Sequence, residues 1–342
     1  MPRKRDGVPE PGSSHSHAVS ESGDVIPFQQ AWLTAARKLG GLPVHTMAPE
    51  EWIPLRVQYT GESKAAARSA IGSDTRGLGL DHCSDDQRAF RALLALALFN
   101  GDVYTGPTAR WNYSVVASYD PVMSPRWDQL VMVAERAPEN VATRLLATVG
   151  AASRGVPGLR HEVSYTCHGQ RSVCLRHLPT GALLTITGDP AGCRRGNRPS
   201  HVPRHPYLTL DNDLTAHERR ALAAVPTISG EAATLLAGLV SRYNLVDRRG
   251  HWATSLSWDP LERPGVERRK EPEVIQQGAV RRLWGTGDSW EFRWTGYPEP
   301  RDLALALTHR EAGVKSAGFS RHGDSYRVVL GTASLDLCDG KG

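Results

Sequence analysis

The fold class is decided by residues 159–187, which read LRHEVSYTCHGQRSVCLRHLPTGALLTIT. Three short runs in this stretch, 159–166, 171–178 and 182–187, have the length and residue content of strands. The two breaks between them, CHGQ and PTG, contain the glycine and proline that tight turns prefer. The stretch therefore predicts three consecutive strands connected by short turns.

The sequence on either side extends these strands into a larger pattern. Trp127–Glu135 predicts a strand and Asn140–Ala152 a helix, which makes the order β-α-β-β-β. A second copy of the pattern is predicted near the end of the chain, at 290–295, 301–309, 314–320 and 326–330. We therefore expect an α+β protein, in which a helical N-terminal part is followed by antiparallel sheets in two β-α-β-β units, each covered by a helix.

Helix starts are marked by capping residues. Ser84 opens the capping box SDDQ ahead of Arg88–Phe99, Thr215 opens the box TAHE, and Ser229 precedes a helix predicted at 230–242. Phe28–Leu39 is also predicted as a helix, which ends at two glycines. A hairpin predicted at 244–258 follows the last helix, so this part has the outline of a winged-helix module.

These patterns divide the chain into six parts. They are a disordered tail at 1–24, a mainly helical segment at 25–126, an α+β unit with a basic Cys/His-rich loop at 127–210, a helix-helix-hairpin segment at 211–258, a linker at 259–278, and the second β-α-β-β unit at 279–342.

Composition excludes several classes of protein. The chain has 342 residues, of which 40% are hydrophobic and 23% charged, and this argues against a wholly disordered, collagen-like or coiled-coil protein. Its longest apolar run, Ala92 to Phe99, is far shorter than the roughly 20 residues that cross a bilayer. No apolar stretch follows the N-terminus, and the five cysteines form no CxxC pair. We therefore expect a soluble cytoplasmic protein without a membrane partner.

The positive charge is concentrated in one segment. Residues 158–206 contain seven Arg against Glu162 and Asp189, a balance of +5, which equals the formal charge of the whole chain. The same 49 residues contain eight of the chain's 18 Cys and His residues. Both kinds of residue can hold a ligand, so this segment is the first place to look for a function.

Its loop at 193–206, CRRGNRPSHVPRHP, contains four Arg and no acidic residue. Arginine forks match phosphate oxygens, so this loop predicts contact with a polyanion. The sequence favours a nucleic-acid-binding accessory protein, and the predicted nucleic-acid contacts are Arg194, Arg195, Arg198 and Arg204, helped by Arg248 and Arg249 of the hairpin.

The same segment contains a candidate zinc site. Zinc takes four thiolate or imidazole ligands, and the available groups are Cys174, His177, Cys193, His201 and His205. Cys174 and His177 are an odd number of residues apart, so on a regular strand they point to opposite faces. The sequence therefore argues against this pair as a clamp; no cofactor is expected, and zinc stays an alternative.

Three functions stay open. No phosphate-binding loop, GxSxG elbow or HExxH motif occurs. Beside nucleic-acid binding, the alternatives are a metal-dependent hydrolase acting on a phosphorylated or nucleic-acid substrate, and a protein-assembly module without chemistry, whose uncovered sheet faces bind a protein partner. The sequence does not determine whether the protein is an enzyme.

Overall fold

The computed structural model describes residues 49–71, 78–100, 122–134, 138–146, 155–167, 169–192, 213–242, 281–294 and 298–340. They all belong to the second of the two units into which the chain divides, Pro43–Gly342. Four predicted features, the tail 1–24, the helix Phe28–Leu39, the hairpin 244–258 and the linker 259–278, lie outside the described residues.

Three helices, α4, α7 and α8, begin directly after the capping residues that the sequence predicts. The described helices are α2 (Pro49–Thr60), α3 (Lys64–Ile71), α4 (Asp85–Leu98), α6 (Pro138–Leu145), α7 (Ala216–Ala223), α8 (Gly230–Ser241) and α9 (Pro300–Leu307). Ser84 accepts a hydrogen bond from Gln87 N at the start of α4, and Ser229 does the same for α8. Thr215 and Glu218 complete the capping box of α7. Each side chain thereby satisfies an amide that the first helical turn leaves unpaired.

The first sheet contains the three strands on which the fold prediction rests. Its strands are β1 (Val122–Pro125), β2 (Gln129–Val133), β3 (Leu159–Cys167), β4 (Gln170–His177) and β5 (Leu183–Thr187), in the order β1-β2-β5-β4-β3. The prediction missed β1, a strand of four residues that ends in proline. The expectation of antiparallel sheets needs one correction, because β2 and β5 are parallel. The β3-β4-β5 meander that follows α6 brings β5 back beside β2 in the same direction.

The second sheet repeats this arrangement. Its strands are β6 (Arg281–Thr286), β7 (Ser289–Trp294), β8 (Gly318–His322), β9 (Ser325–Leu330) and β10 (Ala333–Asp339), in the order β6-β7-β10-β9-β8. Again one pair, β7 with β10, is parallel. The strand predicted at 314–320 starts only at Gly318, because Ser316 has a φ of 67° and Ala317 N bonds back to Val314 O in a turn.

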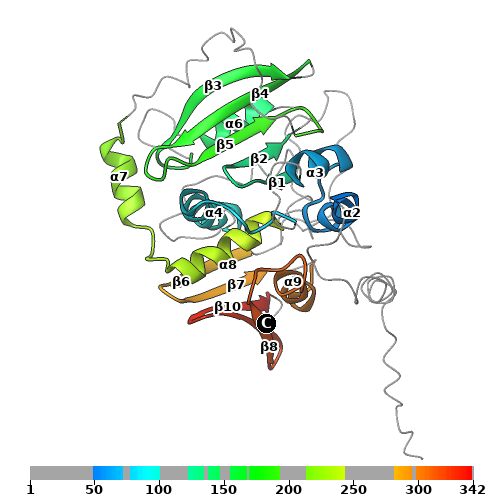
Figure 1. Cartoon of the computed structure of the whole chain (residues 1–342). Helices are drawn as coiled ribbons and strands as arrows, with labels where there is room; N and C mark the ends of the chain where they lie inside the picture. Colours follow the sequence, from blue (N-terminus) through cyan, green and yellow to red (C-terminus); the bar gives the residue numbers. More distant parts are fainter. Residues whose placement is uncertain are drawn as a thin grey trace, which may run out of the picture. The chain divides into compact units, whose positions relative to one another are not determined.

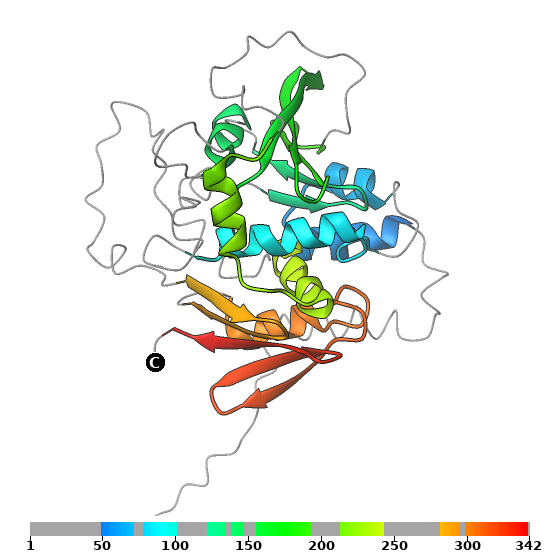
Figure 2. The same cartoon turned by 90° about the vertical axis from the view of Figure 1, so that its left-hand side faces the viewer.

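The chain therefore contains the same architecture twice, although the predicted second copy lacked β6 and β10. In each half a serine-capped helix, α4 or α8, precedes two strands, a second helix and a three-strand meander. The strand order and the position of the parallel pair are the same in both sheets. Figure 1 shows α4 and α8 lying between the sheets, and Figure 2 shows the same layers from the side.

One hydrophobic cluster joins the two halves. Leu94 of α4, Leu239 of α8, Met132 of the first sheet and Leu335 of the second all belong to it, and each is at most 2% exposed. Burial of such side chains is the main favourable term in folding. Among the described residues, no helix has the length and apolar character that crossing a membrane requires.

Candidate functional site

The described arginines of the basic segment are paired with carboxylates. Arg160 binds Glu218 at 2.7 Å, Arg171 binds Glu139 at 3.0 Å and Arg176 binds Glu162 at 2.7 Å. Glu139 and Glu218 lie outside residues 158–206, so the excess of positive charge along the sequence is partly neutralised in space. Each of these three arginines therefore has a carboxylate partner.

All six arginines of the predicted nucleic-acid contact lie outside the described residues. These are Arg194, Arg195, Arg198 and Arg204 of the loop, and Arg248 and Arg249 of the hairpin. Their contact with nucleic acid stays a prediction.

Cys174 and His177 face opposite sides of β4, as their odd spacing predicts. Cys174 packs beside Tyr165 on one face, and its thiol lies 3.9 Å from Glu162 Oε2. His177 lies against Phe90 on the other face, with ring centroids 5.1 Å apart. The pair therefore does not form one half of a zinc site in this arrangement.

The imidazole of His177 has hydrogen-bond partners at both nitrogens. Nδ1 lies 2.9 Å from Thr180 Oγ1 and Nε2 lies 3.2 Å from Pro157 O. Burial lowers the pKa of His177 to about 4, so the ring is neutral at physiological pH. Its surroundings are those of a structural histidine.

The other candidate zinc ligands, Cys193, His201 and His205, lie outside the described residues. Within the described residues, no group of three or more His, Cys, Asp and Glu side chains is arranged to hold a metal ion.

One histidine and serine pair has the spacing of a catalytic dyad. His161 Nε2 lies 2.8 Å from Ser164 Oγ, because a bulge in β3 brings the two residues to the same face. A nucleophilic serine also needs a group that orients its base. The described residues place no carboxylate in hydrogen-bond contact with His161, so the pair lacks this third member.

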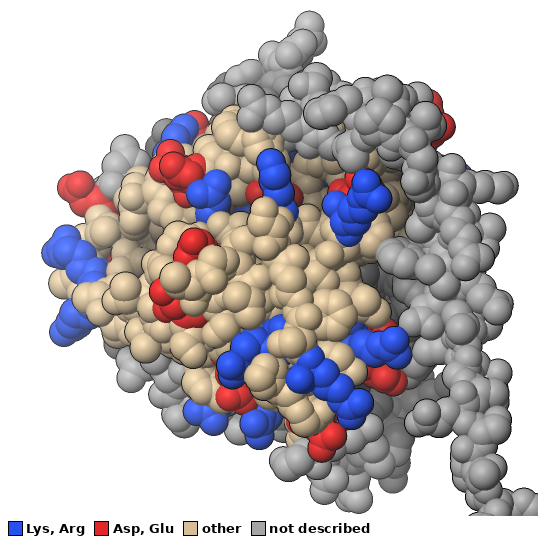
Figure 3. Space-filling view, turned by 60° about the horizontal axis from the view of Figure 1, so that its bottom comes forward, with Lys and Arg blue, Asp and Glu red and all other residues tan. Residues whose placement is uncertain are grey.

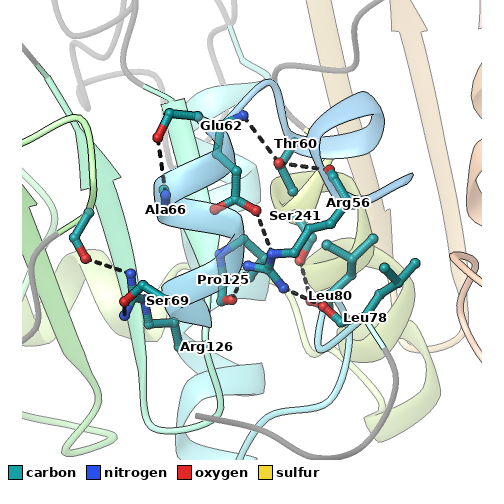
Figure 4. Close-up of polar contacts among 12 residues, drawn as sticks. Arg56, Thr60, Glu62, Ala66, Ser69, Leu78, Leu80, Pro125, Arg126 and Ser241 are labelled. Carbon is teal, nitrogen blue, oxygen red and sulfur yellow. Dashed lines mark hydrogen bonds and ion pairs between the residues drawn. The ribbon is translucent and has the colours of Figure 1, made fainter. Parts of the chain in front are cut away.

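Several arginines serve the interior of the fold, and sequence reasoning did not anticipate this. Arg56, Arg91, Arg126 and Arg242 are each at most 2% exposed. Figure 4 shows Arg56 of α2 between Glu62, Leu78 O and Pro125 O, and Arg126 beside Ser69. Arg242 holds both oxygens of Asp81. These guanidinium groups bind backbone carbonyls that would otherwise be buried without partners.

Side chains also bind backbone groups of single residues at or beside two edge strands, β6 and β1. At the edge strand β6, Asn100 Nδ2 donates to Leu283 O at 2.9 Å and Asn100 Oδ1 accepts from Leu283 N at 3.0 Å. Beside β1, Pro125 O accepts from Arg56 and Arg126 O accepts from Arg91. Side chains therefore occupy backbone groups that another strand could use.

The edge strand β8 is different, because it is uncovered. All five of its residues, Gly318–His322, are exposed. Its counterpart in the first sheet, β3, has Leu159, Arg160, Ser164 and Tyr165 buried. Along the β8 backbone, the described residues supply one side-chain bond, from Ser325 Oγ to His322 O within the hairpin itself. An open edge of this kind can pair with another strand.

Apolar surface is also exposed at this edge. Phe319 of β8 is 39% exposed and Val329 of the adjoining β9 is 37% exposed. Among the described residues, only Trp127 is another large hydrophobic side chain with comparable exposure, and it lies in the β1–β2 turn. In the sequence of β8, GFSRH, one residue of five is large and apolar. A strand with one buried face has apolar residues at alternate positions, so this sequence indicates that neither face of β8 is buried.

Two basic side chains near β8, those of Arg321 and Lys315, are exposed, and the one exposed carboxylate of the hairpin, that of Asp324, lies in the turn. Asp336 behind them is bound by both Arg327 nitrogens, at 2.7 and 2.9 Å. In the lower part of Figure 3, Lys and Arg side chains lie among Asp and Glu side chains. We call Gly318–His322 with Val329 and Lys315 the β8 surface.

Comparison with protein-family models, with curated proteins and with solved structures finds no significant match. Function must therefore be argued from the residues alone.

Proposed function

We propose that the protein is an assembly module that binds a protein partner at the β8 surface and carries out no chemistry there. The observation that supports this most directly is the contrast between the repeated halves. The strand at this position has four of its nine residues buried in the first sheet, as β3, whereas all five of its residues are exposed in the second, as β8.

The exposure of β8 carries a cost that a binding function explains. Unpaired strand edges promote aggregation, and proteins usually cover or block them. Here Arg56 binds Pro125 O of the edge strand β1, and Asn100 binds Leu283 O of the edge strand β6. An edge that is left open beside Phe319 and Val329 has the features of a binding site that takes an added strand.

A photo-crosslinking experiment tests this proposal. Phe319 is replaced by benzoylphenylalanine in the full chain, expressed in its native cells, and Arg301, an exposed residue of α9, is replaced in a matched control. We expect a light-dependent adduct with one protein partner from position 319 and none from position 301. No adduct, or the same adducts from both positions, would remove the proposal.

Nucleic-acid binding is the second candidate, and the charge of 193–206 favours it. If Arg194, Arg195, Arg198 and Arg204 contact phosphates, replacing all four by alanine should flatten the dependence of log affinity on log salt by roughly 3 to 4 units for duplex DNA. A titration of labelled duplex between low and physiological salt measures this. An unchanged slope, or no binding by the wild type at low salt, would exclude this function.

Two measurements on the purified protein separate the candidates early. A 260/280 absorbance ratio above that of pure protein would indicate bound nucleic acid. Stoichiometric zinc by elemental analysis would favour the metal-dependent hydrolase. The assembly module predicts neither.

A further inference from the structure

The β8 surface also indicates the chemistry of its partner, an inference that rests on the proposed function. We infer that β8 takes up an extended segment of another protein, in which an acidic residue and a large apolar residue are two positions apart.

The backbone of β8 lies at the edge of the second sheet. Among the described strands, β8 pairs with β9 alone, in the register Gly318↔Val329 to His322↔Ser325, so its other edge can accept a ladder of main-chain hydrogen bonds. The β8–β9 hairpin has a two-residue turn, in which Gly323 takes a φ of +59° that suits the first position of a type II′ turn. Such a tight turn holds β8 extended, which lowers the entropy cost of adding a strand.

The side chains of β8 differ between the two faces of the strand. Successive residues of a strand point to opposite faces, so Phe319 and Arg321 share a face, beside Val328 and Tyr326 of β9. The rings of Phe319 and Tyr326 are 6.1 Å apart, which supports the position of the exposed Phe319 ring. A strand added to β8 would place two of its own residues, also two positions apart, beside Phe319 and Arg321.

The opposite face offers less for recognition. It carries Gly318, Ser320 and His322 of β8 with the exposed Val329 of β9, and nothing lies within 4 Å of the position where a Cβ of Gly318 would be. Specificity is therefore expected to come from the face with Phe319 and Arg321.

Charge determines which residues fit there. β8 contains Arg321 and no carboxylate, and no described carboxylate forms an ion pair with Arg321, whose Nε donates to Gly323 O. A carboxylate of the added strand can supply that partner, since charge-assisted hydrogen bonds to arginine are among the stronger ones. The residue beside Phe319 should be aromatic or aliphatic, because such cross-strand pairs stabilise a sheet.

Other occupants fit less well. A second copy of β8 has no acidic residue to offer Arg321, and a nucleic acid could bind the arginine but cannot extend the hydrogen-bond ladder of the sheet. Self-association and nucleic-acid binding at β8 are therefore outcomes that would overturn the inference.

Peptide selection tests the inference directly. A display library of random seven-residue peptides is panned against the full chain, and the enriched peptides are synthesised with a fluorescent label. We expect enrichment of peptides that carry Asp or Glu two positions from Phe, Leu, Ile or Val. Enrichment of basic or uncharged sequences, or no enrichment, would overturn the inference.

Variants then place the peptides on β8. Anisotropy titrations should show at least tenfold weaker binding to Arg321→Glu and about threefold to tenfold weaker binding to Phe319→Ala, as expected for the loss of one ion pair and one apolar contact. The matched control, Arg301→Glu, should bind as the wild type does. Circular dichroism of each variant shows whether it is folded. Equal affinity of Arg321→Glu and wild type would place the peptides elsewhere.

The two proposals can fail separately. If position 319 crosslinks to a protein but the selected peptides are not acidic, the assembly function holds and only the partner chemistry is wrong. If position 319 gives no adduct, the function itself is wrong.

Discussion

At the scale of single residues, His177 makes the stability of the protein depend on pH. Its imidazole is 1% exposed, and burial lowers its pKa from 6.5 to about 4. Between these two values the unfolded chain binds a proton that the folded chain does not, so stability falls as pH decreases from about 6.5 to about 4. Urea unfolding at several pH values in this window measures the slope. We expect His177→Gln to reduce the slope of unfolding free energy against pH by the amount that corresponds to about one bound proton.

His309 is a second buried histidine, with which the effect of His177 can be compared. Burial also lowers the pKa of His309 to about 4, so its contribution has the same sign and the same window. The slope of the His177→Gln variant should therefore be reduced but not abolished. If it equals that of the wild type, His177 does not titrate as its environment implies.

At the scale of elements, α7 is anchored by one carboxylate. Both oxygens of Glu218 bind Arg160, and they also accept from Gly158 N and Thr215 N. Burial opposes ionisation of this carboxyl, but the hydrogen bonds outweigh it and lower its pKa to about 2. The stabilisation is therefore present above pH 4.5 and is lost as pH falls toward 2. Glu218→Gln should lower the free energy of unfolding by about 3 to 5 kcal/mol, because it leaves Arg160 buried without its counter-charge.

A partly exposed pair in the same sheet gives the matched control. Glu162, whose side chain is 23% exposed, binds Arg176, whose side chain is 44% exposed. Glu162→Gln should lower the free energy of unfolding by less than about 1 kcal/mol, since surface ion pairs contribute little. Chemical denaturation at pH 7 compares the two variants, and equal losses would show that burial is not what makes the Glu218 pair important.

At the scale of the whole molecule, the shared core predicts that both halves unfold together. Leu239 of α8 belongs to the cluster that joins them and is fully buried. Leu239→Ala should lower the free energy of unfolding by about 2 to 5 kcal/mol. Hydrogen exchange should show the loss equally in β4 and β5 of the first sheet and in β7 and β10 of the second.

The exposed Phe319 supplies the control for this experiment. Phe319→Ala removes a large side chain from outside the shared core, so it should change the free energy of unfolding by about 0.5 kcal/mol or less. Loss of protection in the second sheet alone after Leu239→Ala would show that the halves are separate folding units.

The helix starts and the three strands of 159–187 are determined by the sequence itself. The caps of Ser84, Thr215 and Ser229 act on amides three residues away, so the pattern that predicts each helix also contains the contact that starts it. The turns of 159–187 are likewise local, which is why the α+β class could be predicted.

Tertiary structure alone decided the remaining features. Asn100 binds Leu283 O of the edge strand β6 across 183 residues of sequence, and the buried arginines bind carbonyls of distant segments. Arg160 belongs to the basic segment from which the sequence predicts phosphate contacts. In the structure it binds Glu218, which is 58 residues away in the sequence. Whether a strand is covered or exposed depends on which distant elements pack beside it, and for that reason the sequence could predict a hairpin at β8 but not its open edge.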